Sequence, residues 1–186
     1  QLSRWLEAEP CSCVLRPRQV TVQEPWLILE YEDFAGVTLG QLLATHTLAL
    51  EEQLHLALQL VQALADLHQR HCVLLNLTPD TVLVAPGVPA IRFFDLALAQ
   101  TPVTEAGTID QIADSRQLAY IAPEQTGRTS IGLDYRSDFY SLGVLLYRLF
   151  TNSLPFESDD PNNLIYQQLA TLPRPPSSIA RYLPPV

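Results

Sequence analysis

Residues 73–84, which read Val-Leu-Leu-Asn-Leu-Thr-Pro-Asp-Thr-Val-Leu-Val, constrain the fold of this chain more than any other stretch. They follow an amphipathic helix predicted over Glu51–Arg70 and precede an apolar hairpin that ends in Phe94 and Asp95. In that helix, apolar residues recur at helical spacing and predict a stripe that faces the core: Leu54, Leu58, Val61 and Ala65. Any fold of this chain must therefore accommodate a long helix, a loop with a central proline, two short strands and an aspartate, in that order.

Two strands and a short helix are predicted before this stretch. Val20–Val22 and Trp26–Tyr31 are rich in β-branched and aromatic residues, which is typical of strands. Glu32–Gly36 is polar and contains a glycine, so it predicts a connector. Thr38 is typical of a helix N-cap, and the short helix after it runs through Leu43.

The second half of the chain predicts a loop and two further helices. A hairpin over residues 82–94 is followed by a polar stretch at 100–115, which predicts a surface loop. Residues 137–150 are almost wholly apolar and predict a helix that is buried on all sides. The Asp-Pro pair at 160–161 predicts the start of a last helix, and the proline-rich residues after it predict extended coil.

The composition is that of one globular domain with a substantial core. The chain has 186 residues, of which 47% are apolar and 17% charged. A formal net charge of −9 makes nucleic acid an unsuitable partner, because phosphate binding needs clustered positive charge. No apolar run approaches the roughly 20 residues of a membrane span, so we expect a cytoplasmic protein without membrane contact. The chain begins at Gln1 and contains no Met, and we interpret it as part of a longer protein.

The cysteines and histidines give no strong sign of a metal site. Cys11 and Cys13 lack the Cys-x-x-Cys spacing and a second pair of ligands, so together with Cys72 they are expected to be reduced cysteines. No carboxylate or cysteine in the sequence pattern completes a site with His68 and His71. We therefore expect these histidines to lie at the surface or at the end of the helix.

The loop and the hairpin together resemble the catalytic core of protein kinases. In that family the loop reads His-Arg-Asp-Leu-Lys-Pro-x-Asn, and the strand after it ends in Asp-Phe-Gly. Aligned on the proline, Asn76 stands at the catalytic Asp, Thr78 at the loop Lys and Thr81 at the metal-binding Asn. Asp95 is retained at the position of the metal-binding Asp.

The resemblance extends along almost the whole chain. Ala122-Pro123-Glu124 matches the motif that ends the activation segment, and Asp138 matches the Asp that opens the buried central helix. The sequences of residues 119–128, 134–144 and 154–158 are similar to those of the kinase-like domain that heads large bacterial signalling proteins. Those proteins also carry a P-loop ATPase module, sensor domains and often a histidine kinase.

The fold class implied is α+β and protein kinase-like, mainly the helical large lobe with a remnant of small-lobe strands. Residues 1–31 would be the remnant, consisting of the end of a helix and the last two strands. Residues 32–36 would be the hinge, and residues 37–186 the large lobe without its terminal helices. Glu124 would then lack the Arg that usually pairs with it.

The resemblance also implies site residues. Glu32, Phe34 and Leu83 would line a nucleotide pocket, and Asp95 and Thr81 would hold a metal ion. Glu124 and Asp138 would be structural. Mg²⁺ and ATP are the implied ligands, but the chain contains no Lys, and we predict that their binding is weak or absent.

The substitutions remove charge from the catalytic loop and keep apolar volume. Asn76 cannot accept a proton, Thr78 carries no charge, and Gln117 stands where the activation segment usually has a Thr that joins these two positions. Leu74 and Leu96 replace the His of the loop and the Phe of Asp-Phe-Gly, and Leu75 replaces the Arg. This pattern is typical of a pseudokinase.

Three hypotheses remain open. The first is a pseudokinase that regulates or docks other domains of its parent signalling protein, or protein partners. The second is an active Ser/Thr protein kinase with unusual residues, which transfers the γ-phosphate of ATP to protein hydroxyls. The third is a decayed partial domain with no independent function.

Overall fold

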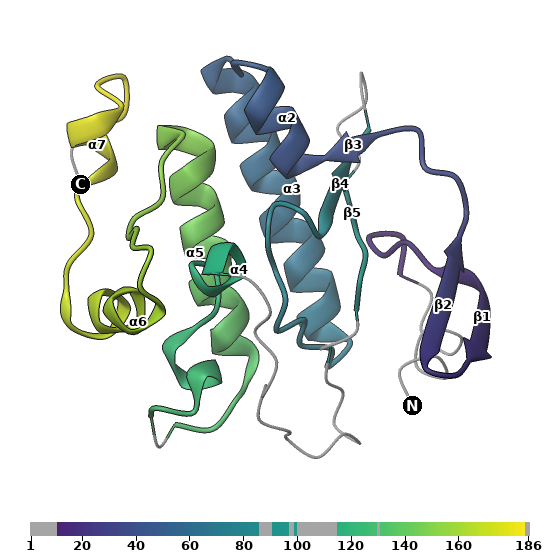
Figure 1. Ribbon diagram of the computed structural model, residues 1–186. Helices are drawn as coiled ribbons and strands as arrows, with labels where there is room; N and C mark the ends of the chain where they lie inside the picture. The colour runs from purple at the N-terminus through teal and green to yellow at the C-terminus, as the bar shows by residue number, and fades with distance from the viewer. Residues whose placement is uncertain (1–10, 86–90, 97–98, 100–114, 130, 185–186) are drawn as a thin grey trace.

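The computed structural model describes residues 11–85, 91–96, 99, 115–129 and 131–184 (Figure 1). The helix end predicted before Pro10 and nearly all of the loop predicted at 100–115 lie outside these residues. The described part is α+β, as predicted. Its elements, in order, are β1 (Pro17–Gln23), β2 (Trp26–Tyr31), β3 (Val37–Thr38), α2 (Leu39–Thr45), α3 (Leu50–Gln69), β4 (Val82–Val84), β5 (Ile91–Phe93), α4 (Ser115–Leu118), the 3-10 helix η1 (Pro123–Thr126), α5 (Tyr135–Thr151), α6 (Pro161–Ala170) and α7 (Pro176–Ile179).

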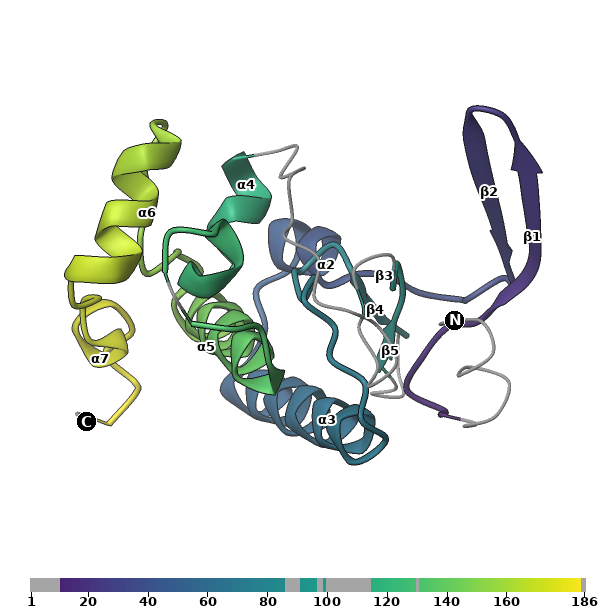
Figure 2. The same cartoon turned by 90° about the horizontal axis from the view of Figure 1, so that it is seen from below.

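β1 and β2 form an antiparallel ribbon that projects away from the helices (Figure 2). Both strands were predicted, although β1 is longer than the predicted Val20–Val22. Val22 and Trp26 are each 71% exposed, and Val20 is 50% exposed. A two-stranded ribbon has little core of its own, which is why these apolar side chains stay in contact with solvent.

β3, β4 and β5 form a second antiparallel sheet in that order. The segment before β1 joins this sheet, because the Leu15 N–H donates to the Phe93 carbonyl at 2.8 Å and the Phe93 N–H to the Cys13 carbonyl at 2.7 Å. Thr38 caps α2 as predicted: its hydroxyl accepts from the Gln41 N–H at 3.1 Å, and the Gln41 side chain accepts from the Thr38 N–H at 3.2 Å.

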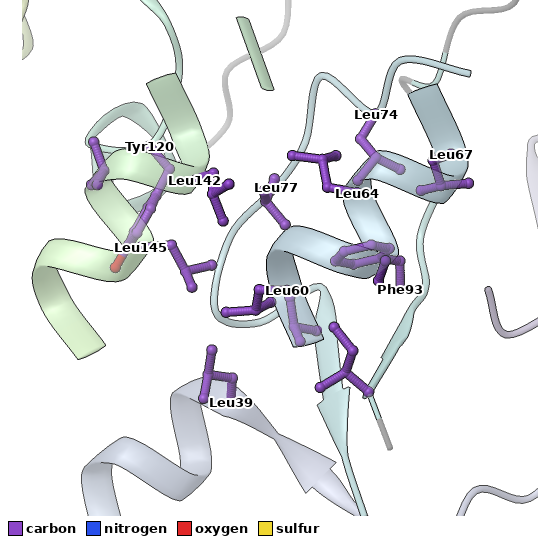
Figure 3. Packing of buried hydrophobic residues seen from close by; sticks show 14 of the residues in the cluster. Leu39, Leu60, Leu64, Leu67, Leu74, Leu77, Phe93, Tyr120, Leu142 and Leu145 are labelled. Carbon is purple, nitrogen blue, oxygen red and sulfur yellow. The ribbon is translucent and has the colours of Figure 1, made fainter. Parts of the chain in front are cut away.

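The core forms where α3, α5, the loop after α3 and β5 meet (Figure 3). α3 spans the predicted helix almost residue for residue, but the predicted core stripe is wrong. Leu54, Leu58 and Val61 are 53%, 55% and 45% exposed. The buried face instead carries Gln53, Leu56, Leu60, Ala63, Leu64 and Leu67. Both sets fit a period of 3.6 residues, so periodicity alone could not decide which face packs against the core.

α5 lies between α3 and the pair α6 and α7 (Figures 1 and 2). Leu142, Leu145 and Leu149 are buried, but Tyr135 and Phe139 are 45% and 51% exposed, so the helix is not buried on all sides as predicted. α6 begins after its predicted Asp160 cap, and α7 is a short helix where coil was expected. Within the described ranges, no helix has the length and apolar character that crossing a membrane requires.

Candidate functional site

The loop after α3 is anchored on the carboxylate of Asp138, in the first turn of α5. This side chain is fully buried and accepts hydrogen bonds from the backbone N–H groups of Leu74 and Leu75, each at 2.8 Å. A buried charge is costly unless donors compensate it, and here the donors belong to the loop itself. The geometry therefore supports the structural role expected of Asp138.

His68, near the end of α3, is the third partner of Asp138. Its Nε2 lies 2.8 Å from Asp138 Oδ2, and only 13% of its side chain is exposed. Its ring also packs against those of Tyr135 and Phe139, with centroids 5.9 and 5.3 Å away. The prediction of a surface or capping histidine is wrong, because its partner lies 70 residues further along the chain and nothing local indicates it.

Gln125, in η1, holds the other side of the loop. Its Nε2 donates to the Leu75 carbonyl at 2.8 Å, and its Oε1 accepts from the Ala122 N–H at 3.0 Å. Leu75 has a left-handed backbone, with φ of 59°. This conformation is uncommon for leucine and persists where surrounding contacts enforce it. Sequence reasoning missed Gln125, since a buried glutamine has no signature of its own.

Thr81 closes the loop from within. Its hydroxyl donates to the Asn76 carbonyl at 2.8 Å and accepts from the Thr78 N–H at 3.0 Å. Both threonines are buried, and the Phe94 N–H donates to the Thr81 carbonyl at 3.1 Å. The Thr81 hydroxyl proposed as a metal ligand is thus committed to bonds inside the loop.

Asn76 and Asp95 face each other across the end of the hairpin. Asn76 Nδ2 donates to Asp95 Oδ2 at 3.4 Å, and both side chains are half-buried. Asp95 has a φ of 56°, so it also adopts the left-handed conformation. The structure therefore brings Asn76, at the position of the family's catalytic Asp, next to Asp95, the predicted metal ligand.

Gln117, in α4, has an exposed side chain.

The residues expected to line a nucleotide pocket do not share one environment. Glu32 is exposed and forms a surface ion pair with Arg18 at 3.8 Å, whereas Phe34 and Leu83 are half-buried. Tyr31, which the sequence did not suggest, reaches the site instead. Its ring lies edge-on to Phe94 with centroids 6.5 Å apart. Burial first, and then the Asp95 carboxylate, raise the pKa of Tyr31 above its ordinary value.

Glu124 has a partner that the sequence did not predict. The Ser137 hydroxyl, at the start of α5, donates to Glu124 Oε1 at 2.7 Å. Ser137 is fully buried, and its bond ties η1 to α5. Glu124 was expected to lack its usual Arg in this chain, and a hydroxyl donor two residues into the helix satisfies it.

A groove of about 820 Å³ lies between α3 and α5, away from Asn76 and Asp95. Its lining includes Val61, His68, Tyr135 and Phe139. A pocket that marks a reactive site usually combines an apolar lining with convergent polar groups. The groove is also lined by His71 and Asp134, but Asn76, Thr81 and Asp95 are not among its lining residues.

Residues 9–181 match the model of the family described as the protein kinase domain. The chain belongs to this family. Among its curated relatives is the serine/threonine-protein kinase PknB of Mycobacterium tuberculosis, with 30% identity over 156 residues, or 83% of this chain and 24% of the relative. Pkn1 of Myxococcus xanthus, also described as a serine/threonine-protein kinase, is 36% identical over 169 residues, or 86% of this chain and 23% of the relative. A probable serine/threonine-protein kinase of Streptomyces coelicolor, SCO3848, is 32% identical over 158 residues, or 84% of this chain and 23% of the relative.

The chain spans about a quarter of the length of these relatives. Protein kinases position ATP with Mg²⁺ and neutralise the charge that develops on the transferred phosphoryl group. The family binds metal through one residue of the loop and one at the end of the hairpin. In this chain the hairpin position keeps a carboxylate, Asp95, but the loop position is Thr81, whose hydroxyl donates to the Asn76 carbonyl. The chain contains no Lys to contact phosphates. The residues present therefore fit a magnesium nucleotide poorly.

Proposed function

We propose that this chain is a non-catalytic protein kinase-like module that regulates or docks other domains of a larger bacterial signalling protein. The observation that carries the proposal is the Asn76–Asp95 pair. At the position of the base, the neutral amide of Asn76 donates from its nitrogen to the Asp95 carboxylate at 3.4 Å. An amide nitrogen in this position cannot accept a proton from a substrate hydroxyl.

The loop frame supports the same proposal. Asp138 and Gln125 hold the backbone of Leu74 and Leu75 at 2.8 Å each, so the loop is firmly placed although its charged groups are replaced. Losing a general base typically lowers a rate by about 10²–10⁴-fold. Thr78 also lacks the positive charge that the family's Lys places near the transferred phosphoryl group. Both losses affect the same transition state, so their effects on the rate need not add.

The decisive experiment restores the family's residues in the full-length protein. Phosphoryl transfer is measured for the unmodified protein, for Asn76→Asp, for Asn76→Asp with Thr78→Lys, and for both with Thr81→Asn. The steps are taken in this order because Thr78 and Thr81 are buried and bonded to each other, whereas Asn76 is half-buried. Asp95→Ala is the background control.

We expect no transfer above the Asp95→Ala background in the unmodified protein. Transfer that appears only in the revertants would identify a competent scaffold silenced at these positions. Transfer by the unmodified protein that Asp95→Ala abolishes would overturn the proposal. If no variant is active and each remains folded, interaction with the neighbouring domains becomes the measurement to make.

Nucleotide binding provides an independent test. We expect millimolar Mg²⁺-ATP to raise the melting temperature of the protein by less than about 1 °C, because ligand stabilisation vanishes when the concentration falls below Kd. A rise of several degrees that Asp95→Ala removes would contradict this expectation.

An active Ser/Thr protein kinase is the second candidate. Asp95 is retained, and it keeps the left-handed backbone that places its carboxylate beside Asn76. Asn76 is also nearly isosteric with Asp. The same series of variants separates the two candidates, because only an active kinase loses a measurable rate in Asp95→Ala.

A further inference from the structure

Two cysteines and an aspartate meet where the segment before β1 passes the last turns of α3 (Figure 2). The Sγ atoms of Cys11 and Cys13 and a carboxylate oxygen of Asp66 all lie within 4.8 Å of one another. Both cysteines are buried, with 4% and 8% exposure, and Asp66 is half-buried. Asp66 lies more than fifty residues away in sequence, so the Cys-x-Cys spacing alone could not indicate a third ligand.

In the structure, Cys11 and Cys13 form a disulfide, in contrast to the prediction of reduced cysteines. Asp66 Oδ2 lies 3.0 Å from Cys11 Sγ and 3.7 Å from Cys13 Sγ. A disulfide carries no S–H, so neither sulfur can donate to this oxygen while the bond is present. The carboxylate is therefore better suited to the reduced pair, in which a proton or a cation lies between oxygen and sulfur.

The surroundings of Asp66 hold its carboxylate in one orientation. Arg70 Nε donates to Asp66 Oδ1 at 3.0 Å, which leaves Oδ2 directed at the two sulfurs. Hydrogen bonds of this kind are what orients a ligating carboxylate in metal sites. The cysteine backbone is also fixed, because the Cys13 carbonyl accepts from the Phe93 N–H at 2.7 Å.

The charges of the site suit a divalent cation. Two thiolates and one carboxylate carry three negative charges, and Arg70 contributes one positive charge beside them. A buried site is stable only when its charges are compensated, and a divalent cation supplies the remainder. Thiolates with one carboxylate favour a borderline-soft ion such as Zn²⁺ over Mg²⁺ or Ca²⁺, which prefer oxygen alone.

We propose that reduced Cys11 and Cys13, together with Asp66, form a binding site for Zn²⁺ that the disulfide excludes. Reduction by a dithiol transfers two electrons and two protons to the sulfurs and leaves the dithiol as its own disulfide. The metal then displaces both protons, and water completes its coordination. The bound ion fixes the segment before the β1–β2 ribbon to α3, so the redox state of two residues decides how firmly that ribbon is attached.

The test uses the full-length protein after reduction with dithiothreitol, which is then removed under anaerobic conditions. Zn²⁺ affinity is measured by competition with a chelating dye, and Co²⁺ is the spectroscopic probe, since thiolate ligands give it an intense near-ultraviolet absorption. The variants are Cys13→Ser and Asp66→Asn. Cys72→Ala removes the third cysteine of these 186 residues, which is buried in the core, and Asp134→Asn is a matched control at the N-cap of α5.

The expected result is that the reduced protein binds one Zn²⁺ more than reduced Cys13→Ser, and that its Co²⁺–thiolate absorption is lost in Cys13→Ser. Asp66→Asn should weaken Zn²⁺ binding at least tenfold, while Cys72→Ala and Asp134→Asn leave it unchanged. Absorption that survives in Cys13→Ser, equal affinity in Asp66→Asn, or equally tight binding by the oxidised protein would each overturn the proposal. If Cys13→Ser does not fold, as judged by circular dichroism, Cys11→Ser serves in its place under the same criteria.

Discussion

Replacing Asp138 by Asn isolates the contribution of one buried carboxylate to the loop. In the structure, Oδ1 accepts from the Leu75 N–H, and Oδ2 accepts from the Leu74 N–H and His68 Nε2, each at 2.8 Å. Asn has nearly the same shape but only one carbonyl oxygen. Its NH₂ group must face at least one of these donors, and a donor cannot satisfy another donor.

The magnitude follows from these contacts. One buried N–H without a partner costs about 1–3 kcal/mol, and one hydrogen bond to a charged group is worth about 1.5–3 kcal/mol. Together they predict a loss of about 2.5–6 kcal/mol in the free energy of unfolding. For a chain of this size each kcal/mol lowers the melting temperature by about 2–4 °C, which gives a decrease of about 5–24 °C.

The assay is urea and thermal unfolding followed by circular dichroism. Asp134→Asn is the matched control, because it makes the same chemical change four residues earlier at an exposed N-cap, where its side chain accepts from the Arg136 N–H at 2.7 Å. Asn caps helices about as well as Asp, so this variant should stay within about 0.5 kcal/mol of the unmodified protein. If Asp138→Asn has the same urea midpoint and melting temperature as Asp134→Asn, Asp138 does not anchor the loop.

Two further predictions concern the contact between η1 and α5. Ser137→Ala should cost about 1–2 kcal/mol in unfolding free energy, because Glu124 loses its 2.7 Å donor but, being half-buried, keeps some access to water; an unchanged denaturation midpoint would show that the bond contributes nothing. Burial, and then the charge of Glu124, raise the pKa of Tyr140 from 10.0 to about 12. The contribution of this group to the free energy of unfolding is therefore fully present below pH 10 and is lost as the pH rises towards 12. Tyr140→Phe should therefore reduce the loss of stability between about pH 10 and 12, measured by urea unfolding at each pH, and an identical pH profile would contradict the assignment.

Much of the fold could be predicted because it depends on local signals in a fixed order. Thr38 and Asp160 mark helix starts through their own side chains, and the strands are set by runs of β-branched and aromatic residues. The succession of helix, proline-containing loop, hairpin and aspartate then identified the family. These signals need no knowledge of what lies on the other side of the core.

The remainder could not be predicted because it depends on long-range partners. α3 carries two apolar stripes, and the burial of Leu60 rather than Leu58 is decided by the loop and β5 that pack on it. His68 pairs with a carboxylate 70 residues away, and Gln125 reaches a carbonyl 50 residues away. Asp66 joins Cys11 and Cys13 because the chain before β1 packs against α3, and the sequence does not show this contact.

The backbone of the loop bears on the choice between a working module and a decayed domain. Leu75 and Asp95 both hold left-handed conformations, which cost about 1–2 kcal/mol each for residues other than glycine. Such a conformation persists only where surrounding contacts enforce it. Leu75 is held by Asp138 on its N–H and by Gln125 on its carbonyl, both at 2.8 Å. The proposed module therefore rests on a loop that lacks the charged groups of the family but is held in a costly conformation by two buried side chains.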